Sequence, residues 1–269
     1  MERIRRTFDR LRRARRAACI PFIMGGDPSG SMTGPLLLAL DDAGADLIEV
    51  GIPFSDPLAD GPMIQRASAR ALARGATPAR VLAAVASVRS RLRAPVVCLT
   101  YWNPVVQFGN QSAGESPAAF LRAARESGCS GVIVPDLPVE EGAVLRAAAR
   151  REQMAAVFLA APTSPPARLR MIARASEGFI YYVSVTGTTG ARDEVPPALV
   201  HGVRQLKLLT AKPVCVGFGI STPAQAAMVA RVADGVIVGS ALVQAIEGAG
   251  RTAPRRAAAF VSRLRRALG

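Results

Sequence analysis

Short and continuously apolar segments recur along the chain at a regular spacing. They are rich in branched side chains and lie at Cys19–Met24, Leu47–Val50, Val96–Thr100, Gly131–Val134, Ala156–Leu159, Phe179–Val183, Val214–Gly217 and Gly235–Val238. Uninterrupted apolarity, in place of alternation with polar residues, is typical of strands that are buried on both faces of a parallel sheet. The pattern therefore predicts eight buried parallel strands.

The segments between these strands have the pattern of amphipathic helices. Ala, Leu and Arg recur at helical spacing in Met63 to Arg74, Pro78 to Arg91 and Pro117 to Glu126. Eight strands that alternate with helices over about 250 residues match a (β/α)8 TIM barrel of the α/β class. A doubly wound open sheet is the alternative, but no GxGxxG motif follows the first strand. No linker divides the chain, so we expect residues 1–269 to form a single TIM-barrel domain.

The N-terminal residues 1–16 are basic, which is a feature of transit peptides. However, Glu2 and Asp9 are acidic, and Ile4, Phe8 and Leu11 recur at helical spacing. We therefore expect an extra N-terminal helix that packs on the barrel.

Composition and charge exclude several classes of protein. The chain has 269 residues, half of them hydrophobic, and can bury a large core. No apolar run reaches the roughly 18–20 residues of a membrane span. All but two of the 34 basic residues are arginines, and the formal net charge is +14. These arginines are scattered over predicted helices without aromatic residues to stack bases, so we expect solvated helix faces and no nucleic-acid or membrane partner.

The cysteines and the histidine argue against a structural metal. The four cysteines form no CxxC pair, and His201 is the single histidine. Three of the cysteines lie within apolar segments, where free thiols behave as small hydrophobic groups. We expect a reduced, cytoplasmic protein with no metal site.

The second predicted strand carries a charge. Active sites of TIM barrels form at the C-terminal ends of the strands, and Glu49 interrupts an apolar strand. Burial of a carboxyl raises its pKa, which suits proton transfer near neutral pH. The alternative is an ion pair with an arginine of a neighbouring element. Asp60, at the end of the long loop that follows, places a second carboxylate at the same face, whereas Asp56 is either a turn residue or a partner contact.

Other strand ends carry glycine clusters. Val185–Arg192 holds two glycines around threonines, which fits an active-site lid or a plain glycine turn. Gly217–Pro223 and Gly239–Ala241 follow the last two strands, where TIM barrels frequently bind phosphate. We therefore expect a phosphorylated small-molecule substrate. Lys207 and Lys212 lie away from these strand ends, which argues against Schiff-base chemistry, and one histidine cannot supply the metal ligands of a metal-dependent aldolase.

The loop from Glu49 to Gly61 closely resembles the signature of the tryptophan synthase α-subunit family. Further segments resemble the same family, in order along the chain from about residue 1 to 245: Pro21-Phe22-Ile23, Gly26-Asp27-Pro28, Leu99–Pro104, Val134–Pro138, Ala161–Thr163, Phe179–Gly187 and Val216–Pro223. The resemblance implies a lyase of tryptophan biosynthesis. Its reaction is the retro-aldol cleavage of indole-3-glycerol phosphate to indole and glyceraldehyde 3-phosphate.

The resemblance also implies roles for individual residues. It places the proton-transferring carboxylate at Glu49 and the acceptor of the indole N–H at Asp60. The substrate-binding residues implied are Phe22, Ile64, Tyr101, Tyr181, Thr189 and Phe218, with Thr189 on the lid. The phosphate-binding residues implied are Gly190, Gly219, Gly239 and Ser240.

The family works as an αββα complex with a β subunit that holds pyridoxal phosphate. The resemblance therefore implies that this chain binds no cofactor of its own and that Asp56 and Pro57 lie at the partner interface. Two alternatives remain open at this point. One is a free-standing indole-3-glycerol-phosphate lyase, and the other is a basic binding protein without catalytic activity.

Overall fold

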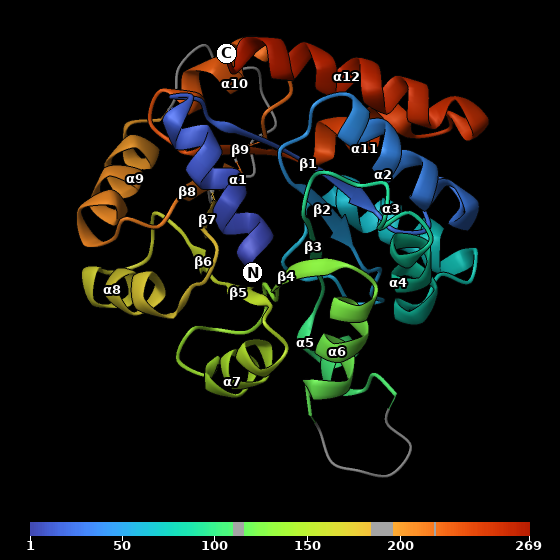
Figure 1. Cartoon of the computed structure of the whole chain (residues 1–269), viewed down its shortest axis with the longest axis horizontal. Helices are drawn as coiled ribbons and strands as arrows, with labels where there is room; N and C mark the ends of the chain where they lie inside the picture. Colours follow the sequence, from blue (N-terminus) through green and yellow to red (C-terminus); the bar gives the residue numbers. More distant parts are fainter. Residues whose placement is uncertain (110–115, 184–195, 218) are drawn as a thin grey trace.

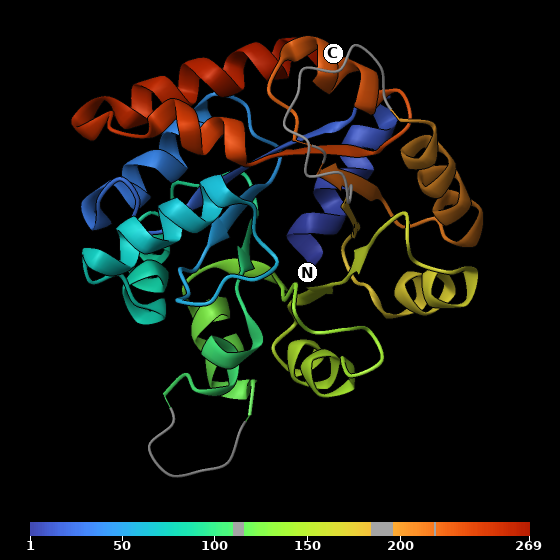
Figure 2. The same cartoon turned by 180° about the vertical axis from the view of Figure 1, so that it is seen from behind.

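The computed structural model describes residues 1–109, 116–183, 196–217 and 219–269. Its strands form one parallel sheet, ordered β5-β4-β3-β2-β1-β9-β8-β7-β6, that curls into a barrel surrounded by helices (Figures 1 and 2). The strands are β1 (Ala18–Met24), β2 (Ile48–Gly51), β3 (Val96–Leu99), β4 (Cys129–Ile133), β5 (Ala155–Val157), β6 (Leu159–Ala160), β7 (Ile180–Val183), β8 (Val214–Gly217) and β9 (Gly235–Val238). The predicted parallel TIM barrel is confirmed.

The predicted fifth strand, Ala156–Leu159, is wrong as a single strand. The structure divides this segment into β5, which pairs with β4, and β6, which pairs with β7. The break falls at Phe158, whose N–H donates to the Ser176 hydroxyl at 3.3 Å instead of to a neighbouring strand. This side-chain hydrogen bond replaces a ladder bond at the Phe158 N–H, whereas the Phe158 carbonyl still accepts from the Tyr181 N–H of β7 at 3.2 Å.

Alternation along the strands separates the barrel interior from the helix-facing surface. Successive side chains of a strand point to opposite sides. Interior side chains include Ile20, Leu47, Val97, Ile133 and Cys215, and helix-facing side chains include Ile23, Ile48, Val50, Cys98 and Val132. Glu49 follows Leu47 by two residues and pairs in register with Phe22 of β1 and Val97 of β3. The Glu49 side chain therefore points into the interior.

The helices cover the outside of the barrel, and five of them begin with proline, whose fixed φ suits the first helical position. The helices are α1 (Glu2–Arg13), α2 (Thr33–Asp42), α3 (Pro62–Ala73), α4 (Pro78–Ala86), α5 (Trp102–Val106), α6 (Ala118–Glu126), α7 (Ala143–Arg151), α8 (Pro166–Ala175), α9 (Pro197–Leu209), α10 (Pro223–Ala230), α11 (Ser240–Ile246) and α12 (Ala253–Ala267), with 3-10 turns at Gly30–Met32 and Gly250–Thr252.

Helix α4 ends earlier than the predicted Arg91. The Ser87 hydroxyl donates to the carbonyl of Ala84 at 2.8 Å, directly after the last helical residue. Beyond it, Val88 and Arg91 donate to carbonyls three residues back, which is the pattern of tight turns and not of an α-helix. The sequence periodicity continued past the point where the backbone turns toward β3.

Helix α1 crosses one end of the barrel, in front of the strands in Figure 1 and behind them in Figure 2. Its buried side chains Ile4, Phe8 and Leu11 belong to the same apolar cluster as the barrel interior. The predicted N-terminal helix is confirmed, with bounds inside residues 1–16. It closes the N-terminal end of the barrel, so the opposite end, formed by the C-terminal ends of the strands, is the barrel mouth.

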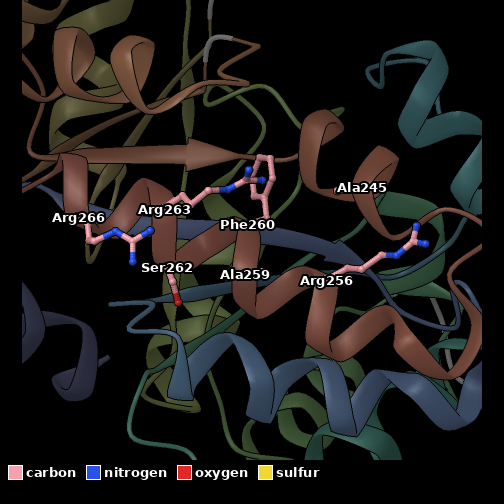
Figure 3. A pocket seen from close by; sticks show the side chains of 7 residues that line it. All are labelled: Ala245, Arg256, Ala259, Phe260, Ser262, Arg263 and Arg266. Carbon is pink, nitrogen blue, oxygen red and sulfur yellow. The ribbon is translucent and has the colours of Figure 1, made fainter.

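A shallow groove of about 580 Å³ runs along the outer surface of α12 (Figure 3). It is lined by Ala245 of α11 and by Arg256, Ala259, Phe260, Ser262, Arg263 and Arg266 of α12. The Arg263 guanidinium lies 6.0 Å from the centre of the Phe260 ring. No residue of this groove is among the predicted site residues.

In the described ranges, no helix is long and apolar enough to cross a bilayer.

Replacing Phe8 by alanine should lower the free energy of unfolding by about 3–5 kcal/mol, as for other buried phenylalanines. The ring is 4% exposed, and its centre lies 6.0 Å from that of Phe179. Urea unfolding followed by circular dichroism measures the change. Arg13→Ala, on the exposed side of α1, is the control and should change stability by about 0.5 kcal/mol or less. An unfolding midpoint of Phe8→Ala equal to that of the unaltered chain would show that α1 does not seal the barrel in solution.

Candidate active site

Strand β2 carries a buried carboxyl group that points into the barrel interior and has no partner among the described residues. Glu49 is 1% exposed, and neither of its carboxylate oxygens has a hydrogen-bond partner among the described residues. Burial raises the pKa of Glu49 to about 8, and the negative charge of Asp60 adds to the effect. The alternative interpretation of Glu49 as half of an arginine ion pair finds no support in the described part of the chain.

The other buried carboxylates are all paired. Three aspartates are buried elsewhere in the described residues, and each faces an arginine at 2.6–3.0 Å: Asp27 with Arg70, Asp41 with Arg93 and Asp46 with Arg16. A guanidinium offsets the cost of removing a carboxylate from water. The fold supplies one wherever a carboxylate is buried for structural reasons, which makes Glu49 the exception.

Asp60 lies on the loop between β2 and α3 and is half-buried. Burial raises its pKa to about 6, and the nearby Tyr101 hydroxyl opposes that shift. The Ala59 N–H donates to the Tyr101 hydroxyl oxygen at 3.0 Å, and the Gln65 side chain donates to the Asp60 carbonyl at 2.9 Å. These two hydrogen bonds hold the loop so that its carboxylate acts electrostatically on Glu49.

An apolar wall lies beside Glu49. Phe22 of β1 packs in one cluster with Ile64, which lies in the first turn of α3. Gly239 faces both side chains, because a Cβ there would lie 3.6 Å from the Phe22 ring and 3.8 Å from Ile64. Gly51 leaves room for the same ring, since a Cβ at Gly51 would come within 2.6 Å of it. The structure thus brings Phe22, Ile64 and Gly239 together.

Tyr181 of β7 approaches the carboxyl groups from the other side of the barrel. Burial and the negative charges of Glu49 and Asp60 raise the pKa of its phenol well above the ordinary value. Its hydroxyl occupies the space over Gly217, where a Cβ would lie 2.8 Å from the oxygen. Tyr181 and Tyr101 therefore belong to the same site as the two carboxyls.

The predicted phosphate-binding residues are only partly described. Gly219 follows β8, is exposed and has φ +55, and Ser240 begins α11 after the neighbouring strand β9. The Gln225 side chain already accepts hydrogen bonds from the N–H groups of Ser221 and Thr222, which satisfies donors at the start of α10. Thr189, Gly190 and Phe218 lie outside the described residues.

The loop after β2 presents residues to solvent. Asp56 is exposed and Pro57 is half-buried. Leu58, which the sequence analysis missed, is 91% exposed. A large apolar side chain directly after the Asp56-Pro57 pair is the sequence signal that could have identified it.

Both lysines are engaged away from the carboxyls. Lys207 forms an ion pair with Asp234 at 2.9 Å. The Lys212 ammonium donates to the carbonyls of Ala173 and Ser176, at 2.8 and 2.6 Å, at the C-terminal end of α8. Neither amine reaches the barrel mouth, in agreement with the sequence analysis. Within the described ranges, no three His, Cys, Asp or Glu side chains lie close enough together to hold a metal ion.

Comparisons with known proteins agree with this geometry. A model of the tryptophan synthase alpha chain family matches residues 8–267. The tryptophan synthase alpha chain of Gloeobacter violaceus is 53% identical over 243 residues, covering 90% of this chain and 86% of the relative. That of Geobacter sulfurreducens is 45% identical over 270 residues, covering 100% of both.

Solved structures are similar over the same length. Tryptophan synthase subunit alpha from Legionella pneumophila superposes with a TM-score of 0.89 at 36% identity, covering 99% of this chain and 98% of that one. A tryptophan synthase structure from Mycobacterium tuberculosis gives a TM-score of 0.89 at 39% identity, covering 98% and 97%.

The raised pKa of Glu49 makes stability depend on pH. Below the ordinary pKa of 4.5 the carboxyl is neutral in both the folded and the unfolded chain, and its favourable contribution is complete. As the pH rises from 4.5 to about 8, the unfolded chain ionises while the folded chain keeps its buried carboxyl protonated, so stability is lost progressively, and the loss is complete above about 8. Between pH 4.5 and pH 9, the free energy of unfolding of Glu49→Gln should therefore rise by about 4–5 kcal/mol relative to that of the unaltered chain.

Urea unfolding of both proteins across that pH range measures the difference. Glu141→Gln, which alters an exposed carboxyl, is the matched control. A constant difference between Glu49→Gln and the unaltered chain at all pH values would mean that the Glu49 carboxyl is solvated.

Proposed function

The chain belongs to the tryptophan synthase alpha chain family of lyases in tryptophan biosynthesis, and from that premise we propose that Glu49 and Asp60 catalyse the cleavage of indole-3-glycerol phosphate to indole and glyceraldehyde 3-phosphate. The observation that carries this assignment is the buried, unpaired Glu49 carboxyl beside the Phe22 and Ile64 wall. A neutral carboxyl in that position is an acid ready to deliver a proton to an aromatic ring.

The two pKa values assign different roles to the two carboxyls. At neutral pH, a Glu49 pKa of about 8 keeps that group mostly protonated, whereas an Asp60 pKa of about 6 leaves that group mostly ionised. Carboxyl pairs whose environments separate their pKa values divide acid and base work between them. Glu49 is therefore the proton donor, and Asp60 is the hydrogen-bond acceptor.

The first step protonates the indole ring. Glu49 transfers its proton to C3 of indole, which places positive charge on the ring nitrogen. The Asp60 carboxylate accepts a hydrogen bond from the ring N–H and stabilises that charge as it develops. The ring itself then serves as the electron sink, so this chain needs no cofactor of its own for the step.

The second step breaks the carbon–carbon bond. The Glu49 carboxylate removes the proton of the hydroxyl on the side-chain carbon that is attached to C3. The C–O bond becomes the aldehyde of glyceraldehyde 3-phosphate, and the electrons of the broken C–C bond return to the ring and neutralise its nitrogen. Glu49 regains its proton and is ready for the next turnover.

The remaining predicted residues surround the substrate in this proposal. The indole ring lies between Phe22, Ile64, Tyr101 and Tyr181. Phe218 and the lid residue Thr189, which lie outside the described residues, are further substrate contacts in this proposal. Support comes from the proximity of Phe22 and Ile64 and from the influence of both carboxyls on Tyr181. The phosphate binds Gly219, Gly239 and Ser240, which follow the paired strands β8 and β9, together with Gly190, which lies outside the described residues.

A β subunit docks on the loop after β2 in this proposal, in an αββα assembly whose pyridoxal phosphate belongs to the β subunit. Asp56, Pro57 and the exposed Leu58 form one part of the contact. A groove of about 550 Å³ adjoins them, lined mainly by apolar residues that include Phe54, Pro104 and Phe108. Charged residues are depleted from the centres of protein interfaces, which this groove resembles.

The protein is cytoplasmic and forms a single domain in this proposal. All four cysteines are free and buried, which fits a reducing compartment such as the cytoplasm. Helices α1 and α12 both pack on the barrel, which supports a single domain over residues 1–269.

Glu49→Gln should lower the rate of indole release by at least about a thousandfold, because glutamine cannot donate the proton. Asp60→Asn should lower the same rate by a smaller factor, about a hundredfold, because the amide oxygen can still accept a hydrogen bond from the ring N–H. Indole release from indole-3-glycerol phosphate by the purified chain with β subunit measures both. Binding of an indolyl-alkyl phosphate to Glu49→Gln is the control for an intact site. Turnover of Glu49→Gln at the rate of the unaltered chain would refute the proton-transfer role.

Addition of the β subunit should raise the rate of indole release by this chain about tenfold or more, as a coupled partner does. Leu58→Asp should abolish most of that stimulation by placing a charge in the contact. Leu208→Asp is the matched control, since Leu208 is 87% exposed on α9. High activity that is unchanged by the β subunit would instead identify a free-standing lyase.

A further inference from the structure

One guanidinium connects three segments that meet beside the barrel mouth. Arg70 of α3 donates from Nε and Nη2 to the two carboxylate oxygens of Asp27, at 2.9 and 2.8 Å. Its third nitrogen, Nη1, donates to Glu247 at 2.5 Å. Asp27 lies in the turn after β1, and Glu247 directly follows α11. Arg70 thus joins the connections that follow β1, β2 and β9.

Apolar packing between α3 and α11 does not by itself define their relative position. The contact is formed by Ile64, Ala67 and Ala71 of α3 and Val243 of α11, together with the end of β1. Contacts of small apolar side chains are weak individually and have no preferred direction. A guanidinium that binds a carboxylate through two parallel hydrogen bonds adds geometric specificity.

The burial of this network fits a geometric role. Asp27 is 1% exposed, and the Arg70 side chain is 25% exposed. Removing the Asp27 charge from water costs about as much as its attraction to Arg70 returns, so this pair contributes little net stability over apolar residues. The Glu247 carboxylate is 38% exposed, and an ion pair that remains partly in water also contributes little stability.

The connected segments carry opposite ends of the substrate site. Helix α3 begins two residues after Asp60 and carries Ile64, whereas α11 begins at Ser240. We infer that Arg70 is a positioning residue that sets the distance between the Asp60 side and the Ser240 side of the site. The inference rests on the proposed function, in which Gly239 and Ser240 contact the phosphate while Asp60 contacts the indole ring. A displacement of about 1 Å between two such groups is enough to weaken binding or catalysis strongly.

The test compares an indolyl-alkyl phosphate with the corresponding indolyl-alkyl alcohol. Arg70→Lys retains the charge but loses the planar fork that reaches both partners. Calorimetric titration should show about a tenfold loss of affinity for the phosphate and a change within about twofold for the alcohol. In the assay of indole release with β subunit, KM should rise about tenfold while kcat stays within about threefold.

Arg16→Lys is the matched control. Arg16 binds the buried Asp46 through two hydrogen bonds, at 2.6 and 3.1 Å, at the end of the barrel that α1 closes. Both lysine variants should lose similar amounts of stability in urea, but Arg16→Lys should leave the affinity for the indolyl-alkyl phosphate unchanged.

Glu247→Ala removes only the link to α11 and leaves the Asp27 pair intact, so it tests the same inference if Arg70→Lys folds poorly. Glu247→Ala should lower the affinity for the indolyl-alkyl phosphate about threefold.

Three outcomes would overturn the inference. One is unchanged phosphate affinity in both Arg70→Lys and Glu247→Ala. Another is an equal loss of affinity for phosphate and alcohol, and the third is the same loss in Arg16→Lys. If the unaltered chain binds the indolyl-alkyl phosphate but releases no indole from indole-3-glycerol phosphate, the proposed function is contradicted and the inference on Arg70 is not. The comparison of phosphate with alcohol would still decide the role of Arg70.

Discussion

Burial of one carboxyl group without a counter-charge is the constraint on which the rest of this site depends. A carboxylate in an apolar interior is expensive, so the group remains neutral to a higher pH than in water. Glu49 is 1% exposed and has no partner among the described residues, and its pKa rises to about 8. Asp60 lies closer to solvent, with a pKa of about 6. The difference in burial between a strand residue and a loop residue separates an acid from an acceptor, although both are carboxyls.

The barrel creates the environment that this difference requires. Alternation along β2 turns Glu49 inward above Leu47, in register with Phe22 on one side and Val97 on the other. Helix α1 covers the other end of the barrel with Ile4, Phe8 and Leu11, so the interior below Glu49 is filled with apolar side chains. The extra helix and the acid are therefore parts of one arrangement, because the helix closes the end of the interior opposite the mouth, where Glu49 lies.

The many arginines of the chain have a structural explanation at several positions. Each buried aspartate of the described residues forms an ion pair with a guanidinium, which fixes the segment that carries the aspartate. Glu49 has no guanidinium partner among those residues, and its carboxyl stays neutral. Arg70 forms an ion pair with the buried Asp27 and also binds Glu247 across the contact between α3 and α11.

The sequence by itself determined the parallel barrel, the N-terminal helix, Glu49 as an unusual strand residue, and the glycine clusters at the strand ends. These are local signals, carried by the period of apolar residues and by single residues that violate it. The tertiary structure alone decided the break at Phe158, the end of α4 at Ala86, and the absence of an arginine near Glu49 among the described residues. It also decided the meeting of Arg70 with Asp27 and Glu247, which lie 43 and 177 residues away along the chain. Periodicity encodes which face of an element is buried, whereas the partner that a polar group finds there depends on how distant elements pack.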